Sequence, residues 1–471
     1  MNSARDLNSS SLERVDLPTR PFAIRCAEGL RSALLGDSLS YFASKIVPGF
    51  MGLITVPVLI RLIGLDQYGH FAVLAPIMMA VSAVSSGWLA QGLLRFHPGE
   101  GDEGKREIAF DRAVRVGTAA TVLVTVLALS AMLGGLGYSF LATFSSVAFC
   151  LSLAVYTIVL ARFQARLLPT IILRREIIRS VGGFVIPVAL IFITGRKQFE
   201  YVLLGQAIAY SIASLGRGFV ESTSTQGRSV ASTRSSERSS KRVPDSFSTA
   251  SILRQLWRFG WAVGLWLLLS QGLPVIDRWT IQKFDGYASA GIYASLYEVA
   301  VRSLSFLVYP LTQAAHPRIM RAWNEGQFAA SHRIMRQSIL SQLVIFAAVL
   351  GAVFLAAPRI TRMILGFDDP GATRMLPILL IGGFLWQFAL LLHKPLEIAQ
   401  RTSSMLAAMA AAMVVNIVAC FQLIPRFGYQ AASYILGLSA CAYIAITLCM
   451  TGFGALRGFQ PVPEPQGEFS D

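Results

Sequence analysis

The sequence predicts an all-α membrane protein of about twelve transmembrane helices. Hydrophobic residues make up 54% of the 471 residues, charged residues make up only 14%, and the mean hydropathy is +0.56. This composition lies well outside that of soluble globular domains. Apolar stretches of about 20 residues, each long enough to cross a bilayer as a helix, recur along the chain. They are residues 39–60, 71–94, 113–134, 138–161, 171–194, 200–219, 258–280, 288–312, 338–357, 373–393, 403–424 and 429–451.

The lysine and arginine residues indicate how these segments are oriented. With the N-terminus in the cytoplasm, 30 of the 41 basic residues fall on the cytoplasmic side, nine fall on the other side, and Lys45 and Arg302 fall inside spans. Cytoplasmic loops carry such an excess in membrane proteins. We therefore expect a multi-pass protein of the inner (cytoplasmic) membrane with both termini in the cytoplasm. Topology and contact with anionic membrane lipids then explain the net charge of +15 without nucleic acid.

A stretch rich in Ser and Arg divides the chain. Residues 221–250 contain 14 Ser or Thr and show no apolar periodicity, which is typical of a flexible linker. Because six spans precede it and six follow, the two halves enter the membrane in the same orientation, as parallel repeats do. The predicted parts are a basic cytoplasmic tail without a signal peptide, a six-helix bundle, a cytoplasmic linker, a second six-helix bundle and a cytoplasmic tail, at residues 1–38, 39–220, 221–252, 253–452 and 453–471.

The segment 288–312 carries two charges, Glu298 and Arg302, near its middle. A charge at mid-bilayer costs on the order of 3 kcal/mol, so it usually faces the protein interior or water. Small and polar residues recur there at steps of three and four, and so share one helix face. They are Gly291, Ser295, Glu298, Arg302, Ser305, Tyr309, Thr312 and His316. Two interpretations stay open: a self-neutralising pair that holds the bundle together, or part of a cargo path.

The segment 39–60 has a similar polar stripe, formed by Tyr41, Lys45, Pro48, Gly52 and Thr55. Lys45 has no acidic residue within one helical turn. An unpaired cation that faces a cavity suits an anionic ligand such as a pyrophosphate. The alternative is that Lys45 extends to the cytoplasmic headgroups.

Prolines interrupt the first predicted helix of each half. Pro48 and Pro57 lie in the first segment and Pro274 in the seventh, where hinges or passive kinks are expected. Asp277 closes the seventh segment, and we expect it to serve as an external gate or loop contact rather than at mid-membrane. Asn416 is expected to join helices by a hydrogen bond.

The sequence contains no pattern typical of catalysis. GxSxG, P-loop and HExxH motifs are absent, and the five cysteines and five histidines lack the spacing of a disulfide framework or a zinc site. We therefore predict that the protein is not an enzyme, has no catalytic residues and needs no metal or cofactor.

Three stretches carry a resemblance to a known family. They are IRLIGLDQYGHFAVL, VIDRWTIQKFDGYASAGIYA and VVNIVACFQLIPRFGYQAASY, in this order. In order and spacing they resemble the polysaccharide flippases, which export O-antigen and exopolysaccharide repeat units and belong to the multidrug/oligosaccharidyl-lipid/polysaccharide exporter superfamily. The similarity extends over about residues 39–450.

This resemblance implies a V-shaped pair of six-helix bundles around a central cavity that opens alternately to the two sides. The implied cargo is an undecaprenyl-pyrophosphate-linked oligosaccharide, moved outward for polysaccharide, lipopolysaccharide or exopolysaccharide biosynthesis. Other polysaccharide-assembly proteins are potential partners, and a proton gradient, a sodium gradient or the membrane potential would drive transport. We predict that Tyr41, Lys45, Glu298, Arg302 and Ser305 bind the cargo.

Two alternative functions are a multidrug antiporter and a membrane glycan polymerase or ligase. A multidrug antiporter of the same superfamily with cationic cargo should carry acidic residues in its cavity, whereas the charges predicted within spans are Lys45, Arg302 and Glu298. A membrane glycan polymerase or ligase commonly has a large external loop, and the longest one predicted here, about 359–372, is short. Both comparisons favour a flippase with anionic cargo.

Overall fold

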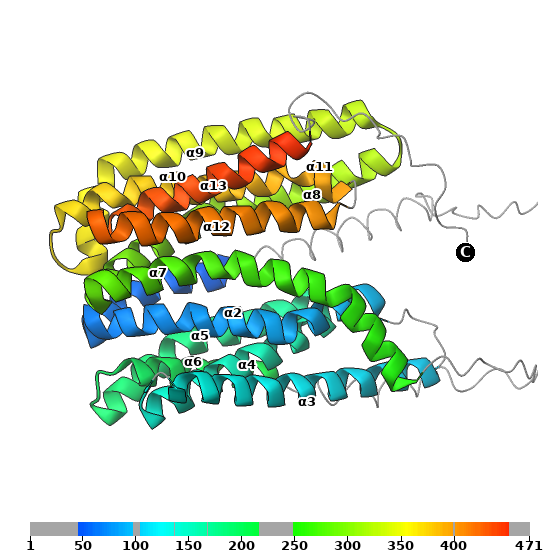
Figure 1. The fold of residues 1–471 in the computed structure, drawn as a ribbon, viewed down its shortest axis with the longest axis horizontal. Coiled ribbons are helices and arrows are strands. Elements are labelled where there is room, and N and C mark those ends of the chain that lie inside the picture. Colours follow the sequence, from blue (N-terminus) through cyan, green and yellow to red (C-terminus); the bar gives the residue numbers. More distant parts are fainter. Residues whose placement is uncertain are drawn as a thin grey trace, which may run out of the picture.

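The computed structural model describes residues 46–97, 104–135, 137–166, 168–215, 248–398 and 401–451, and these residues form helices and turns without a β-strand. Two groups of helices are visible, with α7 between them (Figure 1). The first group contains the helix Ile46–Ile63, α2 (Leu65–Phe96), α3 (Gly104–Gly135), α4 (Phe140–Ala165), α5 (Pro169–Thr194) and α6 (Phe199–Leu215). The second group follows α7 (Thr249–Leu307) and contains α8 (Tyr309–Asn324), α9 (Phe328–Leu365), α10 (Pro370–Leu392), α11 (Lys394–Ile398), α12 (Thr402–Phe427) and α13 (Ala431–Met450).

The helices agree with the predicted spans. Nine helices of the described chain are long and apolar enough to cross a membrane, or ten if the bent helix 249–304 is counted. α6 is a shorter apolar helix, and α7 covers two predicted segments, 258–280 and 288–312, which Gly286 separates with a φ of 85°. The described part of each of the twelve predicted segments is therefore helical apart from a few residues, which are Tyr138, Ser139, Val308, His393, Tyr429, Gln430 and Thr451.

Short turns connect the helices at one end of the molecule. The distribution of basic residues predicts that this end is external. Gly286 and Gly428 have positive φ angles in such turns, and glycine is the residue that adopts this conformation without strain. Gly195 and Gly366 also have positive φ angles, and they end α5 and α9 in the left-handed helical conformation. These connections lie together at the left-hand end in Figure 1, so consecutive helices are held close to one another there.

α2 packs along much of α7 through close contacts at glycines. A Cβ atom at Gly69 would overlap the backbone of Tyr287, and one at Gly260 would overlap the backbone of Trp88. At the amino-terminal end of α7, Ile252 and Leu256 belong to a buried cluster. The cluster also contains Leu89 and Leu93 of α2 and Phe110 and Val114 of α3. The first part of α7 thus packs on the first group of helices, and its second part carries the chain to the second group.

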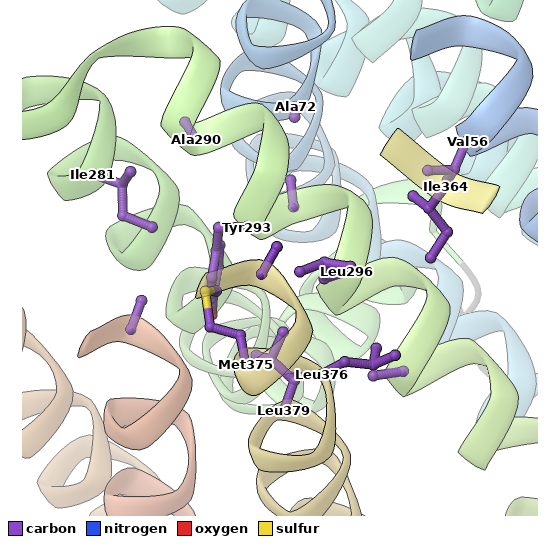
Figure 2. Packing of buried hydrophobic residues seen from close by; sticks show 14 of the residues in the cluster. Val56, Ala72, Ile281, Ala290, Tyr293, Leu296, Ile364, Met375, Leu376 and Leu379 are labelled. Atoms are coloured by element: carbon purple, nitrogen blue, oxygen red, sulfur yellow. The ribbon is translucent and has the colours of Figure 1, made fainter. Parts of the chain in front are cut away.

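The largest buried cluster joins the two groups. Val56 of the first helix and Ala72 of α2 belong to the same cluster as Tyr293 of α7, Ile364 of α9 and Met375 of α10. Figure 2 shows these side chains on converging helices. Because burial of apolar side chains stabilises contacts between helices by dispersion, this cluster holds the two groups together near the end with the short turns.

Gly69→Ala should destabilise the protein because the added methyl group meets a backbone carbonyl rather than a flexible side chain. Overpacking of this kind costs about 1–3 kcal/mol. We expect a lower unfolding temperature for the detergent-solubilised variant in a thermal melt. Gly134→Ala is the matched control, since no atom lies within 4 Å of its added Cβ. Equal unfolding temperatures for both variants would contradict the described contact between α2 and α7.

Candidate functional site

A polar cavity lies among the helix Ile46–Ile63, α2, α4, α5, α6 and α7. Its volume is about 180 Å³. Three arginines and one glutamate line it: Arg179, Arg278, Glu298 and Arg302. We call it the arginine cavity. Charged side chains within membrane spans usually face a polar interior of this kind, because exposure to lipid is costly.

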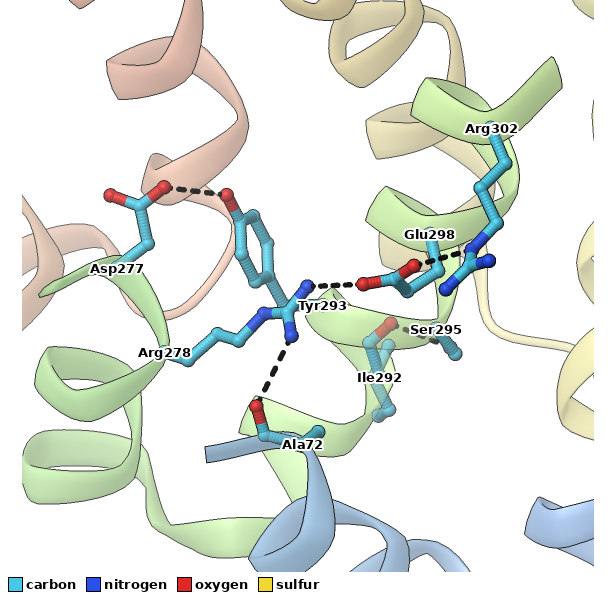
Figure 3. A network of polar contacts seen from close by, with 8 residues as sticks. All are labelled: Ala72, Asp277, Arg278, Ile292, Tyr293, Ser295, Glu298 and Arg302. Carbon is cyan, nitrogen blue, oxygen red and sulfur yellow. Dashed lines mark hydrogen bonds and ion pairs between the residues drawn. The ribbon is translucent and has the colours of Figure 1, made fainter. Parts of the chain in front are cut away.

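On the α7 side of the arginine cavity, one carboxylate binds two guanidinium groups (Figure 3). Arg302 Nε donates to Glu298 Oε2 at 2.7 Å, and Arg278 Nη2 donates to Glu298 Oε1 at 2.9 Å. Arg278 Nη1 also donates to the carbonyl oxygen of Ala72 in α2, at 3.2 Å. The ion pair between Glu298 and Arg302, one of the two interpretations left open by the sequence, is present, and Arg278 joins it as a second partner.

The predicted polar stripe of the first helix faces this cavity. Pro48, Gly52 and Thr55 all line it. A Cβ atom at Gly52 would overlap the guanidinium of Arg302, so the absence of a side chain at Gly52 lets Arg302 extend to this position. Tyr41 and Lys45 lie outside the described residues, as does the side chain of Ser305, and their predicted contacts with cargo stay predictions.

The opposite wall of the arginine cavity comes from α5 and α6. Arg179 donates from Nε and Nη2 to Glu176 Oε2, at 2.9 and 2.7 Å, and from Nη1 to the hydroxyl of Tyr210 at 3.3 Å. Gln206 donates from Nε2 to the carbonyl oxygen of Gly183 at 2.8 Å. Arg179 therefore stands on the wall facing α7, held by a carboxylate and a phenol.

Two cavity arginines were missed as site residues by sequence reasoning. The count of basic residues placed Arg179 in a cytoplasmic loop and Arg278 in an external one, and both positions are wrong because both residues lie within helices. For Arg179 the sequence held a signal, since it falls inside the predicted span 171–194 with Glu176 three residues before it. A charged pair at this spacing inside a span predicts an interior-facing site.

The arginine cavity carries an excess of positive charge. The three guanidinium groups face two carboxylates, Glu298 and Glu176, among the described residues around it. Arginine is always protonated, and its planar fork matches carboxylate and phosphate oxygens. Low-dielectric walls focus the field of such charges. The arrangement can therefore bind an anion with several oxygen atoms.

Asp277 lies away from the arginine cavity, on the other side of α7. It is fully buried, accepts from Tyr293 Oη at Oδ2 (2.9 Å) and accepts from Asn416 Nδ2 at Oδ1 (2.9 Å). The predicted loop position of Asp277 is wrong because α7 continues to Gly286 as a helix. Asn416 also donates to Ser439 at 3.3 Å, so it joins helices as predicted. A gate role for Asp277 stays a prediction.

The predicted hinge prolines lie inside helices. Pro48 and Pro57 belong to the helix Ile46–Ile63, and Pro274 lies inside α7. The 40° bend of α7 is located between Trp261 and Val263 rather than at Pro274. A hinge function of these prolines is still a prediction.

The fold is that of a multi-pass membrane protein with a charged cavity between its helices, and comparisons with known proteins agree. The family model described as "Polysaccharide biosynthesis protein" matches residues 34–323, more than half of the sequence. The chain therefore belongs to the polysaccharide biosynthesis protein family, as the sequence motifs predicted. A comparison with curated protein sequences found no match.

Solved structures of transporters share the fold. The lipid II flippase MurJ in an inward closed conformation is similar over 89% of this chain and 87% of that chain, with a TM-score of 0.63 and 12% identity. The MATE multidrug transporter DinF-BH is similar over 89% and 95%, with a TM-score of 0.60 and 14% identity. An inward-facing MATE family transporter of the MOP superfamily has a TM-score of 0.56 at 11% identity, over 90% and 93%. These similarities confirm the predicted fold class.

Proposed function

We propose that this protein is a flippase that moves an undecaprenyl-pyrophosphate-linked oligosaccharide across the inner membrane for polysaccharide, O-antigen or exopolysaccharide biosynthesis. The observation that supports this most is the convergence of Arg179, Arg278 and Arg302 on one cavity. A pyrophosphate presents several charged oxygen atoms within a short distance, which suits a set of guanidinium forks. Membership in the polysaccharide biosynthesis family and the transporter fold support the same conclusion.

The charges around the cavity disfavour the alternative of a multidrug antiporter with cationic cargo. Glu298 and Glu176 are each bound by arginine at 2.9 Å or less. A cationic drug would have to displace a guanidinium from its carboxylate and would then stand beside that guanidinium. Because like charges repel strongly in a low-dielectric cavity, an anion is the better ligand.

The direct test is a flipping assay with the purified protein in liposomes, using an undecaprenyl-pyrophosphate-linked oligosaccharide as cargo and a cationic dye as comparison. We expect flipping of the lipid-linked glycan above the rate in protein-free vesicles and no dye transport. Imposing a proton gradient, a sodium gradient or a membrane potential, one at a time, identifies the driving force. We propose that transport needs no bound cofactor. Dye transport without glycan flipping would favour the antiporter.

The proposed orientation places the termini and the linker in the cytoplasm. Alkaline phosphatase is active only outside the cytoplasm, so fusions at Gly69 and Gly428 should be active and a fusion at Ser235, which lies outside the described residues, should be inactive. The physical reason is the bias of the basic residues: without Arg179 and Arg278, which lie within helices, 29 remain on the cytoplasmic side against eight on the other. An active fusion at Ser235 would overturn the arrangement of two halves with the same orientation.

Gly52→Ala should impair flipping without removing any charge. The added methyl group would occupy the position of the Arg302 guanidinium, and Arg302 would have to take another rotamer. We expect a flipping rate reduced about tenfold, because a misplaced charged group loses one or more hydrogen bonds to cargo. Gly351→Ala in α9, with no atom within 4 Å of the added Cβ, is the matched control. A wild-type rate for Gly52→Ala would show that the observed position of Arg302 is not needed.

A further inference from the structure

The two walls of the arginine cavity differ in chemistry. The α7 wall presents guanidinium groups and a carboxylate, from Arg278, Arg302 and Glu298. The opposite wall presents neutral hydrogen-bonding groups and an aromatic ring, from Gln206, Tyr210, Ser180 and Phe149, next to Arg179. A ligand that fills the cavity can therefore place an anionic part among the guanidinium groups and a neutral polar part against Gln206 and Tyr210.

Gln206 and Tyr210 are held so that part of their hydrogen-bonding capacity remains for a ligand. The bond from Gln206 Nε2 to the carbonyl of Gly183 fixes the amide, and its Oε1 has no partner within the described residues. Tyr210 accepts from Arg179 Nη1 at 3.3 Å, which leaves its own proton available as a donor. One acceptor and one donor thus stand on neighbouring turns of α6.

An aromatic corner adjoins these two groups. The rings of Phe149 and Tyr210 meet nearly edge to face, with centroids 5.9 Å apart and an interplanar angle of 66°. Ligand sites combine apolar and aromatic surfaces of this kind with a few placed polar groups. A sugar ring has matching features, because it carries hydroxyl groups around its edge and C–H groups on its faces.

The size of the cavity limits how much of the cargo can enter. Its volume of about 180 Å³ is smaller than the roughly 300–1,000 Å³ of sites that enclose a drug-sized ligand. A whole oligosaccharide does not fit. The sugar that enters must be one close to the anionic group, because the anion binds on the facing wall.

We propose that Gln206, Tyr210 and Phe149 form a sugar subsite that recognises the first sugar attached to the pyrophosphate. This inference rests on the proposed function, since the arginines must hold the pyrophosphate for the sugar to reach α6. Arg179, Arg278 and Arg302 then supply affinity for any lipid pyrophosphate, whereas the subsite discriminates among cargoes. Gln206 and Tyr210 are specificity-determining residues in this arrangement.

The test measures binding to the full-length protein in nanodiscs. The probes are undecaprenyl pyrophosphate without sugar and the same lipid carrying a single N-acetylglucosamine, galactose or glucose. We expect one sugar-bearing lipid to bind about tenfold more tightly than the sugar-free lipid, as one or two added hydrogen bonds would give. Gln206→Leu and Tyr210→Phe should both remove most of this preference. Gln206→Leu should leave the affinity for the sugar-free lipid unchanged, because Gln206 donates to the carbonyl of Gly183 and not to an arginine partner.

The sugar-free lipid also reports whether each variant is folded and whether its arginines can still bind. If all sugar-bearing lipids bind no more tightly than the sugar-free lipid, the subsite is overturned while the proposed function stands. If Gln206→Leu and Tyr210→Phe weaken all four lipids equally, these residues only support the arginines and the subsite is likewise wrong. If the wild-type protein binds none of the four lipids, the proposed function itself fails, and the subsite with it.

Discussion

Arg302→Gln should abolish flipping while the protein remains in the membrane at normal abundance. Arg302 has 42% of its side chain exposed toward the cavity, and Glu298 holds only its Nε, so the two terminal nitrogens have no partner among the described residues. These nitrogens are available to a phosphate. Loss of a charge-assisted contact in a desolvated site costs about 2–5 kcal/mol, so we expect a flipping rate at least about 30-fold lower.

Arg302→Lys should retain part of the activity, because the charge persists while the fork geometry is lost. The measurement pairs the liposome flipping rate with the protein level in the membrane, and Arg336→Gln at an exposed position of α9 serves as the control. Exchanging Glu298 and Arg302 is a poor control, since the arginine introduced at 298 would face Arg278. Wild-type flipping by Arg302→Gln would remove Arg302 from the cargo site.

Glu298→Gln should lower the stability of the protein as well as its activity. Glu298 is the carboxylate partner of both Arg278 and Arg302, and only 5% of the Arg278 side chain is exposed. Breaking a buried pair by removing one partner leaves an uncompensated charge and costs about 3–5 kcal/mol. We expect a lower unfolding temperature in detergent and less protein in the membrane.

A second substitution separates this electrostatic effect from a simple loss of packing. Glu298→Gln combined with Arg278→Met removes one positive charge together with the negative one, so the double variant should recover much of the unfolding temperature lost by Glu298→Gln. The coupling between the two sites is obtained from the melting curves of the wild type, Glu298→Gln, Arg278→Met and the double variant. If Glu298→Gln alone melts like the wild type, Glu298 is not a structural counterion of Arg278 and Arg302.

Local periodicity predicted much of the candidate site. The spacing of four residues between Glu298 and Arg302 places them on one helix face, and the steps from Pro48 to Thr55 place these residues toward the cavity. Such relations depend only on the geometry of a single helix. The same periodicity and the apolar lengths predicted the helical segments, because a helix that spans a membrane must satisfy its own backbone.

Contacts between helices could not be predicted in the same way. Arg278 reaches Glu298 because the chain reverses at Gly286, and the register of that reversal is set by packing against α2. Asp277 meets Asn416 across 139 residues of sequence. A count of basic residues by loop also fails where an arginine lies inside a helix, as Arg179 does, because it assumes that arginines stay at the membrane surface.

The bond from Arg278 to the carbonyl of Ala72 joins residues that are 206 positions apart. A ribosome that adds about 5–20 residues per second delivers Arg278 roughly 10–40 s after Ala72. During this interval α2 resides in the bilayer without the helix that later covers Gly69 and Gly92. Substitutions that weaken this contact should delay the docking of α7 on α2. The newly synthesised chain is then accessible to membrane proteases for longer. Their effect should therefore fall on the yield of new protein more than on molecules that have already matured.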